Sequence, residues 1–125
     1  MVASEFAKNH RMLIVEDEPL IAIEIEDALI EAEFRIAGVV SSVADAIALI
    51  QQGQCEGAVL DANLFGSSSA PIAEALTAQG IPYVVLSGYL SEQLPNALQS
   101  APFVTKPLRV QQLQNALNAL FPKRS

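Results

Sequence analysis

The sequence lacks the features that mark secreted, membrane-spanning and disulfide-linked proteins. Cys55 is the single cysteine, so no disulfide framework can form and a reducing cytoplasm is the expected setting. No apolar run approaches the ~20 residues that cross a bilayer, and the first ten residues have no apolar segment typical of a secretory signal. The single histidine, His10, lies in that first segment, so Cys55 is expected to be a bystander thiol rather than a nucleophile.

Positive charge is scarce as well. The chain has 7 Lys and Arg against 14 Asp and Glu, which gives a net charge of -7. This excess argues against nucleic acid or an acidic membrane as a direct partner, because both are polyanions. The 125 residues suit a single domain. We expect a poorly ordered leader over residues 1–10, a folded domain over 11–122 and a short tail over 123–125.

Short apolar runs alternate with helical stretches along the chain. The runs predict strands buried on both faces, as in a parallel sheet, over Met12–Val15, Ile36–Val40, Ala58–Leu60, Tyr83–Leu86 and Phe103–Val104. The stretches predict helices over Pro19–Ala32, Ala44–Gln52, Pro71–Gln79 and Leu108–Leu120. A further, short helix is predicted to begin near Leu94 or Pro95 and to end before Pro102, because proline is tolerated only in the first turn.

This alternation predicts a doubly wound α/β domain with a five-stranded parallel sheet, flavodoxin-like (βα)5 in type, with strand order 2-1-3-4-5 and a short fourth helix. In such folds the functional edge lies at the carboxyl ends of the strands. No G-x-G-x-x-G follows the first strand and no P-loop lysine motif is present. Dinucleotide and nucleoside triphosphate binding are therefore not expected.

Polar side chains follow four of the five predicted strands. They are Glu16, Asp17 and Glu18 after the first strand, Asp61 after the third, Ser87 after the fourth and Lys106 after the fifth. Strands one and three are neighbours in the predicted order, so Glu16 and Asp17 should lie near Asp61. Carboxylates that close together need a cation, and oxygen ligands alone suit Mg²⁺. A phosphoryl group on Asp61 could then be held by Lys106 and Ser87.

Each of these residues also has a plain structural interpretation. The acidic run at 16–18 could be a solvated helix start favoured by the helix dipole. Lys106 could be a surface lysine, and Ser87 could belong to a turn. Behind Asp61, Gly66 and three serines are expected to form a loop. The joint placement of the polar residues at successive strand ends favours a functional site.

Four motifs, MLIVEDEPLI, AVLDANLFG, VVLSGY and FVTKPL, resemble the receiver domain of two-component response regulators, over Met12 to Phe121. The resemblance implies a phosphoacceptor aspartate, a set of Mg²⁺ ligands and two residues that contact the phosphoryl group. The phosphoacceptor would be Asp61. The Mg²⁺ ligands would be Glu16, Asp17, Asp61 and the backbone carbonyl of Asn63. Ser87 and Lys106 would contact the phosphoryl group. It also implies a cis peptide bond between Lys106 and Pro107.

The same resemblance implies switch residues. Ser87 would be the switch hydroxyl. Phe103 matches an aromatic switch position that is often tyrosine, although a phenylalanine at such a place is more often a core residue. Tyr89 is either a loop aromatic or a contact residue. Glu16 and Ser87 replace a commoner aspartate and threonine but keep the functional group. Ser-Gly-Tyr at 87–89 resembles the stand-alone receivers that work with HWE-type histidine kinases.

The implied function is that of a single-domain response regulator in a phosphorelay. It would accept a phosphoryl group from a sensor histidine kinase or a phosphotransfer protein, and then switch a protein-binding surface or pass on or drain the phosphate. It would not be an enzyme acting on an external substrate. A pseudo-receiver that binds partners without phosphorylation is the alternative, and a metal-dependent hydrolase would need a carboxylate where Asn63 stands. The uncharged last helix, residues 110–121, does not support a salt-bridged dimer, so a monomer or weak dimer is expected.

Overall fold

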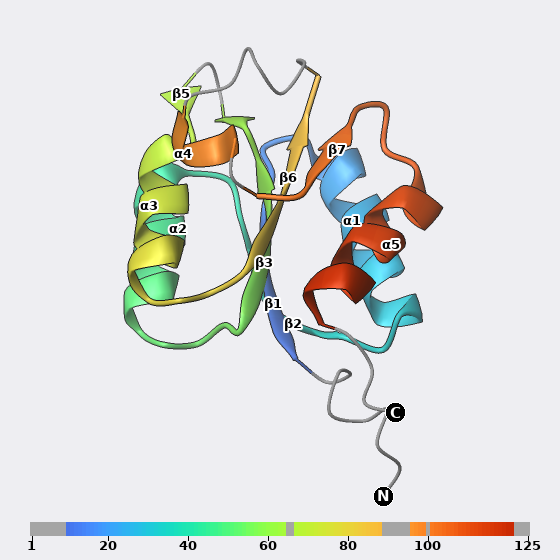
Figure 1. Ribbon diagram of the computed structural model, residues 1–125, viewed down its shortest axis with the longest axis horizontal. Helices are drawn as coiled ribbons and strands as arrows, with labels where there is room; N and C mark the ends of the chain where they lie inside the picture. The colour runs from blue at the N-terminus through green and yellow to red at the C-terminus, as the bar shows by residue number, and fades with distance from the viewer. Residues whose placement is uncertain (1–9, 65–66, 89–95, 100, 122–125) are drawn as a thin grey trace, which may run out of the picture.

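The computed structural model describes residues 10–64, 67–88, 96–99 and 101–121. Its central feature is a five-stranded parallel sheet in the order β2-β1-β3-β6-β7, with helices on both faces (Figure 1). Counted along the chain as strands one to five of this sheet, the order is 2-1-3-4-5. The predicted doubly wound fold is therefore confirmed.

The predicted elements are present, with ends that differ from the expected ones by no more than a few residues. The strands of the sheet are β1 (Arg11–Val15), β2 (Arg35–Val40), β3 (Gly57–Asp61), β6 (Tyr83–Ser87) and β7 (Phe103–Thr105). The helices are α1 (Pro19–Glu31), α2 (Val43–Gln51), α3 (Ala70–Ala78), α4 (Asn96–Gln99) and α5 (Val110–Leu120). Among the described residues, no helix is long and apolar enough to cross a membrane.

The central strands are apolar along most of their length because both of their faces are buried. Helices α1 and α5 cover one face of the sheet, and α2 and α3 cover the other (Figure 1). Along β1, Met12 and Ile14 pack in the core beneath α1 and α5, whereas Leu13 and Val15 pack in the core beneath α2 and α3. All five residues of β3 are buried. This double burial explains why the strands read as continuous apolar runs.

Helix ends follow the local signals of the sequence. Pro19 occupies the first turn of α1, where its missing amide N–H costs nothing. Gly53 and Gly80 follow α2 and α3 with φ of +69°, a backbone conformation that glycine adopts without steric penalty. The Ser42 side chain accepts a hydrogen bond from the Asp45 amide at 3.2 Å and caps α2.

The segment behind Asp61 differs from the expected loop. Strands β4 (Asn63–Leu64) and β5 (Ser67–Ser68) form a two-stranded antiparallel hairpin, with Leu64 buried in the core beneath α2 and α3. The Ser68 hydroxyl accepts a hydrogen bond from the Ala70 amide at 3.1 Å, at the start of α3. Strands of two residues are too short to show an alternating pattern, which is why the sequence alone predicted a loop.

The short fourth helix is confirmed as α4, which ends before Pro102; its predicted start at Leu94 or Pro95 lies outside the described residues. The Leu98 side chain is fully buried. The Tyr83 hydroxyl, at the start of β6, donates a hydrogen bond to the Ala97 carbonyl at 3.0 Å. The Lys106–Pro107 peptide bond is cis, as predicted.

Candidate functional site

The polar residues predicted to act together meet at the carboxyl edge of the sheet. Glu16 directly follows β1, and its amide donates to the Val40 carbonyl at 3.0 Å. Asp61 and Ser87 are the last residues of the adjacent strands β3 and β6. Lys106 follows β7, and its amide donates to the Ser87 carbonyl at 2.8 Å. The strand pairing therefore brings residues from four segments of the chain to one place.

Lys106 is the cation of this edge. Its ammonium nitrogen lies 3.1 Å from Asp61 Oδ2, 3.7 Å from Glu16 Oε1 and 3.7 Å from Glu18 Oε1. Burial lowers the pKa of Lys106, but the attraction of the three carboxylates, that of Asp61 first, outweighs it, so the pKa of Lys106 is raised. An ammonium held among three carboxylates is not an ordinary surface lysine.

Asp61 is held in one orientation. The residue is 4% exposed, and both of its carboxylate oxygens accept a hydrogen bond. Oδ1 accepts from the Asn63 amide at 3.1 Å, and Oδ2 accepts from the Lys106 ammonium at 3.1 Å. The contact with Asn63 comes from the first residue of the β4–β5 hairpin, so the hairpin helps to orient the aspartate. The predicted role of the Asn63 carbonyl in metal binding stays a prediction.

Glu16 is a buried acid. Its side chain has no exposed surface, and burial, together with the neighbouring Asp61 carboxylate, raises the pKa of Glu16 to about 8. Oε2 accepts a hydrogen bond from the Glu18 amide at 3.1 Å. Oε1 accepts none from the residues that the structure describes. A buried carboxylate oxygen without a hydrogen-bond donor is suited to a cation.

The acidic residues after β1 fit a metal ion. Carboxylate oxygens of Glu16, Asp17 and Glu18 lie within 4.8 Å of one another. Carboxylate oxygen is the donor that Mg²⁺ prefers, and the orphan oxygen of Glu16 belongs to this cluster. The predicted ligands Glu16 and Asp17 are therefore together, although the third carboxylate of the cluster is Glu18, to which the sequence assigned no role. The position of Glu18 directly after Asp17 is the sequence feature that could have indicated its place in the cluster.

The predicted switch residues are placed only in part. Ser87 is 1% exposed, at the end of β6. Phe103 pairs with Val85 and is partly buried against the core beneath α2 and α3. Tyr89 lies outside the described residues. The structure thus places Ser87 at the carboxyl edge and Phe103 two residues before the end of β7, but it does not test their roles.

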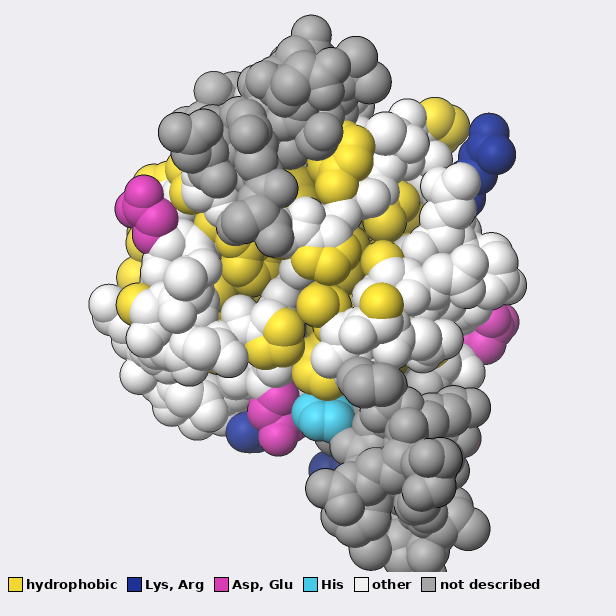
Figure 2. Space-filling view, viewed as in Figure 1, with side chains coloured by type: hydrophobic (Ala, Val, Ile, Leu, Met, Phe, Trp, Pro, Cys, Tyr) yellow, Lys and Arg dark blue, Asp and Glu magenta, His cyan; other side chains and the backbone are white. Residues whose placement is uncertain are grey.

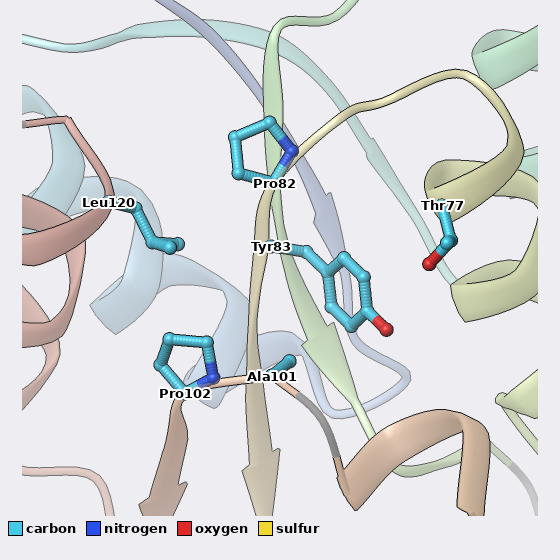
Figure 3. Close-up of a pocket in the computed structure, with 6 residues that line it drawn as sticks. All are labelled: Thr77, Pro82, Tyr83, Ala101, Pro102 and Leu120. Atoms are coloured by element: carbon cyan, nitrogen blue, oxygen red, sulfur yellow. The ribbon is translucent and has the colours of Figure 1, made fainter.

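A pocket lies at the amino ends of β6 and β7, away from the acidic residues. Its volume is about 240 Å³, and Thr77, Pro82, Tyr83, Ala101, Pro102 and Leu120 line it. In Figure 3 the Tyr83 ring points toward α3 and Thr77, while Leu120 lies on the other side of β6. Figure 2 shows hydrophobic side chains gathered in the middle of this face. None of the lining residues is charged. The candidate functional site is therefore the group of charged residues at the carboxyl edge of the sheet, not this pocket.

The fold and the site together define a flavodoxin-like domain with carboxylates and a lysine around a strand-end aspartate. No protein-family model and no curated protein matches the sequence. Among solved structures, SdrG from Sphingomonas melonis Fr1 is 39% identical, with 91% of this chain and 97% of that chain covered and a TM-score of 0.79. The PhyR response regulator REC domain from Erythrobacter litoralis is 28% identical, with 94% and 95% covered and a TM-score of 0.79.

A longer protein shows the same likeness. The response regulator PhyR from Brucella abortus is 27% identical, with 95% of this chain but 51% of that chain covered and a TM-score of 0.75. The chain therefore belongs to the receiver domains of response regulators, as its motifs indicated. Receiver domains generally bind Mg²⁺ through an acidic cluster, and this chain has such a cluster in Glu16, Asp17 and Glu18.

Proposed function

We propose that this protein is a phosphorelay component in which Asp61 accepts a phosphoryl group. The donor would be a sensor histidine kinase or a phosphotransfer protein. The proposal depends chiefly on the 3.1 Å contact between the Lys106 ammonium and the buried Asp61 carboxylate, beside a carboxylate cluster suited to Mg²⁺. The protein would act as a switch or phosphoryl carrier, promoting only its own phosphorylation and dephosphorylation.

In the proposed transfer, an oxygen of Asp61 attacks the phosphorus atom of the donor. A new O–P bond forms as the bond from phosphorus to the donor breaks, and the leaving group takes the electron pair. The Asn63 amide orients the Asp61 carboxylate, while the Lys106 ammonium remains charged and can hold a phosphoryl oxygen. Mg²⁺, held by Glu16 and Asp17, would neutralise charge on the phosphoryl oxygens. Ser87 would then turn toward the phosphoryl group.

We propose α1 as part of the surface that receives the donor. The helix begins directly behind the acidic cluster, and its outward side chains include Leu20, which is 77% exposed, and Ile23, which is 52% exposed. Exposed apolar side chains next to a reaction site are suited to a protein partner. The Ser-Gly-Tyr run at 87–89 supports an HWE-type kinase as that partner. The lone cysteine, Cys55, supports a cytoplasmic location.

The proposal is tested by labelling with acetyl phosphate, followed by intact-mass measurement. We expect the wild-type protein to gain one phosphoryl group in Mg²⁺ and none after chelation of the metal. Asp61→Asn should remain unlabelled, whereas Asp45→Asn, which removes an exposed acid from the first turn of α2, should label normally. An unlabelled wild-type protein, or equal labelling of Asp61→Asn, would exclude Asp61 as the phosphoacceptor.

A further inference from the structure

Glu18 occupies the cap position of α1 without capping the helix. Its backbone is extended, and its side chain makes no capping hydrogen bond. The carboxylate instead lies 3.7 Å from the Lys106 ammonium, and 62% of the side chain is exposed. The backbone amide of Glu18 donates to Glu16 Oε2, and the Glu18 carboxylate also lies within 4.8 Å of carboxylate oxygens of Glu16 and Asp17, which repel it. The position of the side chain is therefore explained by its attraction to Lys106.

Three carboxylates surround the Lys106 ammonium: Asp61 accepts a hydrogen bond from it at 3.1 Å, and Glu16 and Glu18 form ion pairs with it at 3.7 Å. Asp61 would carry the phosphoryl group, and Glu16 is buried beside the cation site. Glu18 is the exposed member of the three, so its contact can break without uncovering a buried charge. An incoming phosphoryl group is negatively charged and requires the same ammonium. Glu18 would compete with it for Lys106 and also repel it.

We propose that Glu18 is a positioning residue that holds Lys106 in the unphosphorylated protein and slows the phosphorylation of Asp61. The proposal depends on the proposed function, because it concerns the entry of a phosphoryl group at Asp61. In the step affected, the Asp61 oxygen forms a bond to phosphorus, and acetate leaves acetyl phosphate with the electron pair of the broken O–P bond. Glu18 takes no part in bond making. It determines how readily the Lys106 ammonium turns to the phosphoryl oxygens.

The test compares Glu18→Gln with wild type and with a matched control, Glu24→Gln. Both substitutions remove one charge from an exposed acidic side chain, but Glu24 lies farther along α1. The glutamine keeps the backbone amide that bonds to Glu16, so the fold is retained, and thermal unfolding verifies this. Labelling by acetyl phosphate in Mg²⁺ should be about three- to tenfold faster in Glu18→Gln, as expected for one exposed charge a few ångströms away. Glu24→Gln should match wild type.

A second measurement uses beryllofluoride with Mg²⁺, a phosphoryl mimic that binds without covalent transfer. Glu18→Gln should bind beryllofluoride about three- to tenfold more tightly than wild type. Added salt should reduce this difference in affinity, because it screens the charge of Glu18. Unchanged rates and affinities in Glu18→Gln, or equal changes in Glu24→Gln, would overturn the proposal. A slower Glu18→Gln with weaker Mg²⁺ binding would instead make Glu18 a metal ligand. A wild-type protein that neither labels nor binds the mimic would refute the proposed function itself.

Discussion

The Lys106 ammonium lies 3.1 Å from Asp61 Oδ2, although 45 residues separate the two in the chain. Parallel pairing produces this contact. Asp61 pairs with Leu86 on β6, and Ser87 pairs with Thr105 on β7, so Lys106 emerges at the same edge of the sheet. A buried carboxylate would be costly without this cation. The contact with Lys106 therefore offsets part of the cost of burying the Asp61 carboxylate.

Replacing Lys106 with methionine should destabilise the metal-free protein. Asp61 is 4% exposed and would lose the ammonium group that lies 3.1 Å from its Oδ2. The free energy of unfolding at neutral pH should fall by about 1–3 kcal/mol, measured by urea denaturation. Added Mg²⁺ should recover part of the loss. Arg109→Met, which removes a nearby exposed positive charge, should change stability much less; an equal loss there would contradict the assignment.

Glu16→Gln should stabilise the metal-free protein at alkaline pH. The pKa of Glu16 is about 8 in the fold, well above its ordinary value of 4.5. Because the folded pKa is the higher one, the stabilising contribution of protonated Glu16 is complete below pH 4.5 and is lost as the pH rises through 8. Glutamine stays neutral, so its advantage should grow across this range and then level off, reaching at least about 1 kcal/mol.

Urea denaturation of both proteins from pH 5 to 9, without metal, measures this difference. The advantage of Glu16→Gln should shrink when Mg²⁺ is added, because the cation favours the ionised carboxylate of the wild type. Glu24→Gln, at an exposed position of α1, serves as the control and should follow wild type at every pH. A pH-independent difference between Glu16→Gln and wild type would show that Glu16 ionises normally.

Tyr83→Phe should loosen α4 selectively. The substitution removes the hydroxyl that donates to the Ala97 carbonyl, and α4 spans only four residues, Asn96–Gln99. We expect a loss of about 0.5–1.5 kcal/mol in global stability. Amide exchange should accelerate in α4 more than in β1, because α4 would lose a hydrogen bond to the sheet and keep only side-chain packing, such as that of the buried Leu98. Equal acceleration in both elements would indicate that the bond supports the whole domain rather than α4.

The double substitution Leu20→Ser with Ile23→Ser should slow phosphotransfer from the cognate kinase by about tenfold or more, because exposed apolar contacts of a partner surface would be lost. Labelling by acetyl phosphate should be unchanged, since a small donor needs no protein surface. Val110→Ser supplies the control: it changes a 39% exposed apolar residue on α5. Kinase transfer that is normal in the double variant would remove α1 from the donor surface.

The sequence by itself determined the order and type of the main elements. Strands buried on both faces give continuous apolar runs, and helix ends carry local signals such as Pro19, Gly53 and Gly80. Because parallel strands must end at a common edge, the same pattern also placed Glu16 and Asp61 together. These inferences need the periodicity, which neighbouring residues encode, and the strand order, which was inferred from the class of fold.

The tertiary structure decided the features that depend on contacts between distant residues. It placed the Glu18 carboxylate against Lys106, and it buried Glu16 deeply enough to raise the pKa of its carboxyl group to about 8. It also paired the β4–β5 hairpin and bonded Tyr83 to Ala97. Residue type and spacing do not specify desolvation or the direction of an exposed side chain. Those follow from the packing of several segments around one point, which exists only when the chain is folded.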